Sequence, residues 1–286
     1  MQLSTMTNIH QIYQDDESFF TTVQCIDACA QAGYRVMDMS LSGITQPGRY
    51  LYLREAQLPW LEEVIDALDQ NHVRFLQCHG VFYGTKLDQK SEDFSMFIEN
   101  IKNNLWLASK LSIPWMVLHP LSCQQYEEHE VQEIMKENVV FFRSLYELSE
   151  KFGVGIAIEN MITGPFQSAE RLLELLDGIN HPASFGVCWD TGHANLTKQN
   201  QAESIYLLGS KLKTTHIADN RGIVDDHLLP FSGIIEWRSL VSAMKKIEYS
   251  GAFSFEAHNA TRNYPLELRK EVLHLSYLIG KNLLEG

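Results

Sequence analysis

Residues 154–190 read VGIAIENMITGPFQSAERLLELLDGINHPASFGVCWD, and this stretch decides the fold. It opens with a continuous apolar run over residues 154–158 and closes with a second run over residues 185–189. Such runs are typical of parallel strands that are covered on both faces. Between them, residues 168–176 are predicted to form a helix that begins at an N-cap serine, Ser168, with Arg171 and Glu174 on its polar side. The stretch therefore predicts a strand–helix–strand unit.

The same alternation extends in both directions along the chain. Strands are predicted at residues 3–8, 34–39, 73–78, 115–118, 154–158, 185–189, 212–217 and 252–255. Helices are predicted at about residues 16–31, 58–70, 94–111, 128–152, 168–176, 202–210, 237–246 and 266–284. Eight such units favour an α/β fold closed as a single (β/α)8 TIM barrel, one domain over residues 1–286. An open doubly wound sheet is disfavoured because no G-x-G-x-x-G follows the first strand.

Composition narrows the class of protein. The chain has 36 acidic and 23 basic residues and a formal net charge of -13, which weighs against nucleic acid as a partner. The start of the chain is polar, and no apolar stretch is long enough to span a bilayer. The cysteines are odd in number, lack a C-x-x-C pair and are interpreted as reduced, buried thiols: Cys25, Cys29, Cys78, Cys123 and Cys188. These features together predict a cytoplasmic protein.

Residues that commonly bind metals stand at the ends of six consecutive predicted strands. They are His79, His119, Glu159, Asp190, His216 and Glu256, and His193 follows Asp190 by three residues. The carboxyl ends of all barrel strands meet on one face, where the active sites of this fold lie. Any one of these residues alone is more often structural. Six around one axis would each be costly to desolvate without a partner, and the carboxylates among them would repel one another. A bound cation relieves both costs, and mixed imidazole and carboxylate donors suit Mn, Zn, Fe or Co better than Ca.

At these residues the sequence resembles the xylose-isomerase-like barrels, which include sugar isomerases, ketose 3-epimerases, inosose dehydratases and abasic-site (AP) endonucleases. The resemblance covers essentially the whole chain. Its most specific stretches are GVCWDTGHANL at residues 186–196 and THIADNRGIVDDHLLPFSGIIEW at residues 215–237. The second stretch is similar to the D-x-H-x-x-P-x-x-G segment of the sugar phosphate isomerase and epimerase branch.

The isomerase and epimerase branch implies one divalent metal per chain, Mn, Zn, Co or Mg, held by Glu159, Asp190, His216 and Glu256. In that branch, a proton moves next to a sugar carbonyl by way of a metal-bound enediolate. The resemblance then makes Glu159 and Glu256 the catalytic acid and base, and His193 a contact to a substrate oxygen. Arg221 is the nearest match to a substrate-binding arginine of ketose 3-epimerases, although its spacing is slightly short.

The endonuclease branch implies more metal, because its members bind three zinc ions with nine residues. All nine positions have a match here: His79, His119, Glu159, Asp190, His193, His216, Asp225, His227 and Glu256. The chain departs from that branch where it reads Asp190-Thr191-Gly192-His193 in place of D-T-C-H, and it lacks clustered Lys/Arg loops for gripping DNA. It also replaces the first glycine of the P-G-x-G loop, since Phe231 follows Pro230.

Several assignments stay open at the level of sequence. His79 and His119 bind either substrate or a second metal, and Asp225 and His227 either join them or pair within their own loop. Asp38 either orients a ligand or is a solvated turn residue. The function expected first is a metal-dependent isomerase or epimerase of a small carbohydrate. The alternatives are an AP-endonuclease-like phosphodiesterase, an inosose dehydratase, and a sugar-binding protein without catalysis. The sugar, its phosphorylation, the native metal and a homo-oligomer, expected only by analogy, are not fixed by the sequence.

Overall fold

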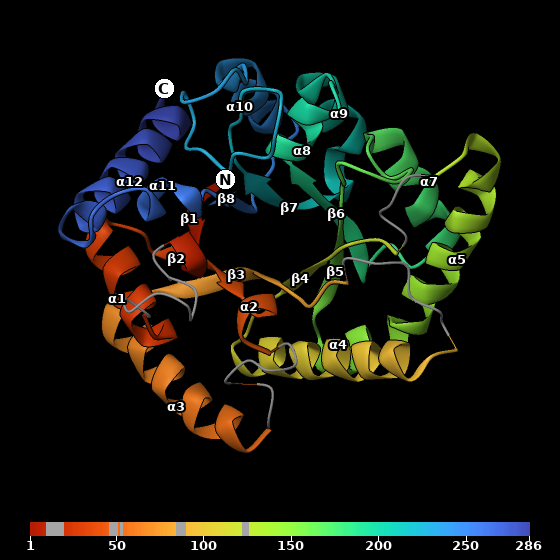
Figure 1. Cartoon of the computed structure of the whole chain (residues 1–286), viewed down its shortest axis with the longest axis horizontal. Coiled ribbons are helices and arrows are strands. Elements are labelled where there is room, and N and C mark those ends of the chain that lie inside the picture. The colour runs from red at the N-terminus through yellow and green to blue at the C-terminus, as the bar shows by residue number, and fades with distance from the viewer. Residues whose placement is uncertain (10–19, 46–50, 52–53, 84–89, 122–125) are drawn as a thin grey trace.

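The computed structural model describes residues 1–9, 20–45, 51, 54–83, 90–121 and 126–286. Its centre is a closed barrel of parallel strands in chain order, in which β1 pairs with both β2 and β8 (Figure 1). The strands are β1 Gln2–Met6, β2 Val36–Ser40, β3 Arg74–His79, β4 Trp115–Leu118, β5 Gly155–Glu159, β6 Phe185–Asp190, β7 Leu212–Ile217 and β8 Ala252–Phe255. The predicted (β/α)8 barrel is thereby confirmed, with each strand within two residues of its predicted bounds.

Helices form a ring around the strands (Figure 1). They are α1 Thr22–Ala32, α2 Ser42–Thr45, α3 Arg54–Asn71, α4 Glu92–Lys110, α5 Val131–Ser144, α6 Tyr146–Phe152, α7 Ala169–Ile179, α8 Thr191–Leu196, α9 Gln201–Leu208, α10 Trp237–Lys246, α11 Asn259–Arg262 and α12 Arg269–Glu285. Ser168 caps α7 as predicted, because its side chain accepts a hydrogen bond from the Arg171 N–H. Gly33 ends α1 with a φ of 121°, a conformation that favours glycine.

The helices differ from the prediction in three ways. The predicted helix over residues 128–152 is two helices, α5 and α6, because the Leu145 N–H bonds to Phe142 in a tighter turn between them. The helix predicted from residue 16 begins at Thr22, where Thr21 and Gln24 form a capping box, and residues 16–19 lie outside the described part. The short helices α2, α8 and α11 were not predicted, since a single turn leaves no measurable period in the sequence.

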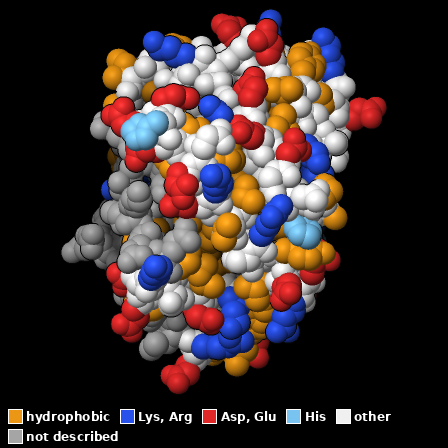
Figure 2. Space-filling model, turned by 90° about the vertical axis from the view of Figure 1, so that its right-hand side faces the viewer, with side chains coloured by type: hydrophobic (Ala, Val, Ile, Leu, Met, Phe, Trp, Pro, Cys, Tyr) orange, Lys and Arg blue, Asp and Glu red, His pale blue; other side chains and the backbone are white. Residues whose placement is uncertain are grey.

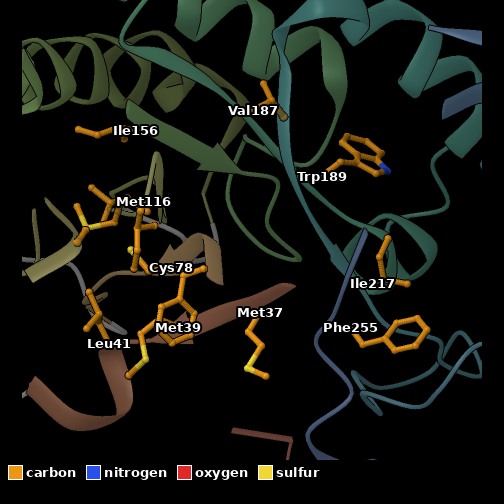
Figure 3. Close-up of a cluster of buried hydrophobic side chains, with 14 of the residues drawn as sticks. Met37, Met39, Leu41, Cys78, Met116, Ile156, Val187, Trp189, Ile217 and Phe255 are labelled. Carbon is orange, nitrogen blue, oxygen red and sulfur yellow. The ribbon is translucent and has the colours of Figure 1, made fainter. Parts of the chain in front are cut away.

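Side chains of the strands alternate between two packed layers. The layer between strands and helices contains Met39, Ile156, Trp189, Ile217 and Phe255 (Figure 3). A second, smaller layer inside the barrel is formed by Val117, Ala157 and Cys188, with Trp115 packed against it. Because successive residues of a strand point to opposite sides, the next inward positions after Ala157 and Cys188 are Glu159 and Asp190. The apolar pattern of the strands therefore aims these two carboxylates along the barrel axis.

The remaining global predictions concern the cysteines and the cell compartment. Cys25, Cys29, Cys78 and Cys188 are buried and free, and Cys123 lies outside the described residues. Burial raises the pKa of Cys29 and of Cys188 to about 12, so these thiols are inert. Of the helices that the structure describes, none is long and apolar enough to cross a membrane. The cytoplasmic location stays a prediction.

Candidate metal centre

The metal-binding residue types of the sequence meet at the carboxyl end of the barrel. His79, Glu159 and Asp190 are the last residues of β3, β5 and β6, and His216 is the second-last residue of β7. Glu256 directly follows β8, as His119 directly follows β4. Parallel strands bring these ends to a single face. There the six residues form overlapping groups of three or four, and the ligand atoms of each group lie within 4.8 Å of one another.

His216 stands at the centre of this group and is fully buried. Its Nδ1 lies 2.8 Å from Glu159 Oε1 and 3.1 Å from Glu256 Oε2. Each of four residues offers one ligand atom to this group, and these atoms all lie within 4.8 Å of one another: Glu159, Asp190, His216 and Glu256. A set of three carboxylates and one imidazole suits a divalent ion such as Mn, Co, Mg or Zn.

Asp190 supplies a direct test of whether a cation fits. Its Oδ1 accepts the His193 N–H at 2.7 Å and so caps α8, while its backbone is fixed by two hydrogen bonds to the Asn160 side chain. Its Oδ2 is buried and has no hydrogen-bond partner among the described residues. A buried carboxylate oxygen without a partner costs free energy unless a cation or proton neutralises it. The residues present therefore fit a divalent metal.

The pKa values in the cluster indicate which groups carry protons in the metal-free chain, and a bound metal would replace those protons. Burial would raise the pKa of Glu159, but His216 and His119 beside it outweigh that effect and hold its pKa well below the usual range. Burial would lower the pKa of His216, but the carboxylates of Glu256, Glu159 and Asp38 raise it well above the usual range. Burial raises the pKa of Asp190 to about 7. Without metal, protons on His216 and Asp190 thus neutralise a site that otherwise holds gathered carboxylates.

Metal affinity is therefore expected to rise with pH. His216 and Asp190 have raised pKa values in the metal-free chain, so both must release a proton before they can bind a cation, and acid opposes that release. We expect Zn²⁺ to bind more weakly at pH 6 than at pH 8, with proton release on binding. Calorimetric titration in two buffers of different ionisation enthalpy measures both quantities. Affinity that is independent of pH over this range would contradict the assignment of these ligands.

A second group lies on one side of the centre. His119 Nε2 is 3.0 Å and His79 Nε2 is 3.5 Å from Glu159 Oε2, and the two imidazole nitrogens are 3.2 Å apart. His79 Nδ1 donates a hydrogen bond to the Gly80 carbonyl oxygen at 2.8 Å, which fixes the ring with Nε2 toward His119 and Glu159. Phe82 stacks on the His119 ring with centroids 4.8 Å apart and is 40% exposed, so it forms a wall of the site.

A third group lies on the other side, in the loop between β7 and α10. Asp225 Oδ2 is 2.9 Å from His227 Nε2 and 3.5 Å from His193 Nε2. The Nδ1 atoms of both histidines face backbone carbonyls, of Glu256 at 2.9 Å and of Asn160 at 2.8 Å. His227 has a φ of 47°, which is uncommon outside glycine and asparagine. The His227 imidazole is therefore held toward Asp225 by a backbone conformation that is unfavourable on its own and that contacts around the loop must stabilise.

Asp219 imposes the shape of this loop, and sequence analysis did not single it out. It is fully buried, and its carboxylate accepts hydrogen bonds from the Gly233 N–H at 3.0 Å, the Ile235 N–H at 3.3 Å and Trp237 Nε1 at 2.9 Å. A Cβ at Gly233 would collide with Asp219 Oδ1 and the Asn220 carbonyl, so only glycine fits there. The signal available in the sequence was the segment Ile217-Ala218-Asp219 at a strand end.

The structure separates the remaining candidates. Arg221 is exposed, and among the described residues no hydrogen bond or ion pair joins its side chain to the cluster; its backbone N–H donates to Asp226. Asp38 is not a solvated turn residue: it lies within β2 and is fully buried inside the barrel. Trp189 is fully buried and belongs to the outer hydrophobic layer drawn in Figure 3. Trp115 packs against the smaller inner layer of Val117, Ala157 and Cys188.

The closed barrel and its convergent imidazole and carboxylate donors define the chain as a TIM barrel with a site suited to a divalent metal. Residues 26–277 match the model of the xylose isomerase-like TIM barrel family. The chain belongs to this family.

Relatives among curated proteins are distant. The uncharacterized protein y4fM of Sinorhizobium fredii is 30% identical over 165 residues, which are 56% of this chain and 52% of that protein. The match thus spans about half the length of that relative. An inosose isomerase of Halalkalibacterium halodurans is 23% identical over 245 residues, which are 82% of both chains. An L-ribulose 3-epimerase of a Methylomonas species is 30% identical over 89 residues, 31% of this chain and 29% of that one.

Solved structures share the fold over the whole chain. A D-tagatose 3-epimerase-like protein superposes with a TM-score of 0.77 at 22% identity, covering 100% of this chain and 97% of that one. An IolI protein with a bound zinc atom superposes with a TM-score of 0.77 at 19% identity, covering 100% and 98%. Identities this low establish a common fold and leave the activity to be argued from the site.

Proposed function

We propose that this chain is a divalent-metal-dependent isomerase or epimerase of a small carbohydrate or inosose, acting by proton transfer next to a carbonyl. The observation that carries the proposal is the pair of carboxylates, Glu159 and Glu256, that approach the same nitrogen of His216 at 2.8 and 3.1 Å. They come from β5 and from the end of β8, which are three strands apart around the barrel. The inosose isomerase and epimerase relatives support the same reaction class.

Each residue of the site has a separate role in the proposed reaction. Glu159, Asp190, His216 and Glu256 would hold the metal, which would polarise the substrate carbonyl and acidify the neighbouring C–H. Glu159 has a depressed pKa and is ionised at neutral pH, so its carboxylate is able to accept the proton from carbon. Glu256 approaches from another side of the barrel. Burial would raise its pKa, but His216 and His227 outweigh that effect and lower it, so it would first take up a proton from solvent and then deliver it to carbon, while Glu159 releases its proton to solvent. Return to the same carbon inverts it, whereas return to the adjacent carbon exchanges aldose and ketose.

The substrate also needs binding groups and exclusion of water. His193 lies next to Asp190 and is held in place by its contact to the Asn160 carbonyl, which suits it to donate a hydrogen bond to a substrate oxygen. The Phe82 ring provides an apolar wall over His79 and His119. A small polyhydroxylated ketone matches this mixture of imidazoles, carboxylates and one aromatic face.

The proposal is tested by incubating the Mn²⁺- or Co²⁺-loaded chain with unphosphorylated ketohexoses, ketopentoses and inososes in deuterated water. Deuterium incorporated at the carbon beside the carbonyl, together with an epimer or aldose as product, is the expected result. Loss of water from an inosose without deuterated epimer would indicate the dehydratase alternative. No exchange with any of these substrates, in a chain shown to contain metal, would contradict the proposal. Light scattering of the same sample tests the homo-oligomer expected by analogy.

One observation favours a second function, that of a phosphodiesterase similar to the AP endonucleases. Imidazoles flank the centre on both sides, and the Nδ1 atoms of His79, His193 and His227 each face a backbone carbonyl. Their Nε2 atoms face carboxylate oxygens at 2.9 to 3.5 Å, and a histidine whose Nδ1 is held by a carbonyl is typical of metal ligands with fixed tautomers. All nine residues matched to the three-zinc pattern are thus brought together.

Metal content separates the two functions. One metal per chain after dialysis, bound through the central four residues, supports the isomerase or epimerase. Three tightly held zincs, two of them lost on replacing His119 and His227 with alanine, would favour the phosphodiesterase, and cleavage of a duplex with one abasic site would then be measured. The face drawn in Figure 2 carries acidic and basic side chains interspersed, and the net charge is -13, which favours the smaller, uncharged substrate.

A further inference from the structure

We propose that Asp38 is a positioning residue that orients His216 and so fixes which ring nitrogen is available to the metal. This inference rests on the proposed function, because it concerns the same site. Asp38 lies in β2, opposite the wall of the barrel that carries the ligands, and its side chain is fully buried. It belongs to no group of metal donors that the described residues form.

The contacts of Asp38 converge on one of its oxygens. Oδ2 accepts a hydrogen bond from Gln77 Nε2 at 2.6 Å and from Ser254 Oγ at 3.3 Å, and it lies 3.4 Å from His216 Nε2. Gln77 Nε2 also donates to the Thr215 carbonyl at 3.1 Å, which holds the amide in place. Oδ2 is therefore kept beneath the imidazole by donors from β3 and β8, independently of His216.

The two nitrogens of His216 face opposite surroundings. Nδ1 faces the carboxylates of Glu159 and Glu256, whereas Nε2 is buried and has no hydrogen-bond partner within hydrogen-bond geometry among the described residues. On that side, the carboxylate oxygen Asp38 Oδ2 lies 3.4 Å from Nε2. A neutral imidazole carries one proton, so an acceptor at Nε2 leaves the lone pair on Nδ1, which points at the metal donors.

The burial of Asp38 needs an explanation that packing does not give. A carboxylate inside a barrel costs several kcal/mol by order of magnitude unless donors or charges compensate it, and an apolar side chain would fill the same layer without that cost. The adjacent inner layer is indeed apolar, being made of Val117, Ala157 and Cys188. A carboxylate that accepts the distal N–H of a metal-binding histidine is a recurrent device that orients the ring and raises its basicity.

The test compares Asp38→Asn with Ser254→Ala as Co²⁺-binding proteins. Asparagine preserves shape and volume but lacks the charge. Ser254→Ala removes only the longer of the two hydrogen bonds to Oδ2, at 3.3 Å, and leaves the carboxylate and its Gln77 donor at 2.6 Å in place. We expect Co²⁺ to bind about 10- to 100-fold more weakly to Asp38→Asn, with a changed visible absorption spectrum, and to bind Ser254→Ala within about threefold of the wild-type affinity. Urea unfolding of both metal-free variants shows whether the fold is intact.

A second measurement does not depend on any variant. In the Zn²⁺-loaded wild-type chain, nitrogen-15 spectra of the histidine side chains should show His216 protonated at Nε2 and coordinated at Nδ1. The reverse assignment would overturn the inference, as would equal Co²⁺ affinity in wild type and Asp38→Asn or an equal loss in Ser254→Ala. A wild-type chain that binds no Co²⁺ would overturn the proposed metal function itself, and this inference with it.

Discussion

Replacing Glu159 with glutamine is expected to abolish most of the proton exchange at the substrate carbon, by about 1,000-fold in kcat/KM, within the range for loss of a general base. Glutamine has nearly the same shape but cannot take a proton at neutral pH. It also removes the negative charge that lies 2.8 Å from His216 Nδ1 and 3.0 Å from His119 Nε2. Deuterium exchange measured by NMR gives the rate, and elemental analysis of the same sample gives the metal content.

The matched control is Glu174→Gln, an exposed glutamate of α7 that pairs with Arg171 at 2.8 Å. A surface pair of this kind contributes little, so activity and metal content should stay at the wild-type level. Metal retained in Glu159→Gln with activity lost would assign Glu159 to proton transfer alone. Activity within tenfold of wild type would remove Glu159 from the mechanism.

Replacing Asp219 with alanine is expected to lower the free energy of unfolding by about 3–5 kcal/mol. The carboxylate accepts four hydrogen bonds, from the Asn220, Gly233 and Ile235 N–H groups and from Nε1 of Trp237, which is 2% exposed. Alanine leaves those donors without an acceptor, and each orphaned buried donor costs roughly 1–3 kcal/mol. Because the loop carries Asp225 and His227, the variant should also lose any metal bound by that pair.

Asp226→Asn is the control in the same loop. Asp226 is only half-buried, and its Oδ2 accepts one N–H, that of Arg221, at 3.2 Å. Its stability is expected to stay within about 0.5 kcal/mol of wild type. Urea unfolding followed by tryptophan fluorescence measures both variants. If Asp219→Ala were as stable as Asp226→Asn, the buried acceptor would not be what holds the loop.

The two proposed functions use the same centre and differ in the groups beside it. Both need Glu159, Asp190, His216 and Glu256. The phosphodiesterase also needs His119 and His227 as ligands, whereas the isomerase or epimerase leaves these free to contact substrate. His119 is a useful discriminator, because burial lowers its pKa and leaves it neutral at pH 7, able either to bind metal or to hydrogen-bond a hydroxyl. Metal stoichiometry decides between these roles before any substrate is known.

The sequence by itself predicted the barrel and which residues lie together at the carboxyl ends of its strands. Eight apolar runs alternate with amphipathic segments, and this period is a local property that needs no tertiary information. The ends of parallel strands meet on one face by topology, so placing His79, Glu159 and Asp190 at strand ends already predicted that they lie together. The predicted roles of these residues stay proposals for the experiments above.

Only the tertiary structure decided which atoms face one another. The orientation of His216 between two glutamates and Asp38 joins four strands, and nothing local in the sequence fixes a ring nitrogen. Asp38 was equally compatible with a solvated turn, because a single aspartate has no period that reports its burial. Asp219 escaped notice for a related reason: its partners at Gly233, Ile235 and Trp237 are 14 to 18 residues away. Both sets of contacts depend on how the chain folds in three dimensions, the first across the barrel and the second within the β7–α10 loop, and the spacing of residues along the sequence does not report either.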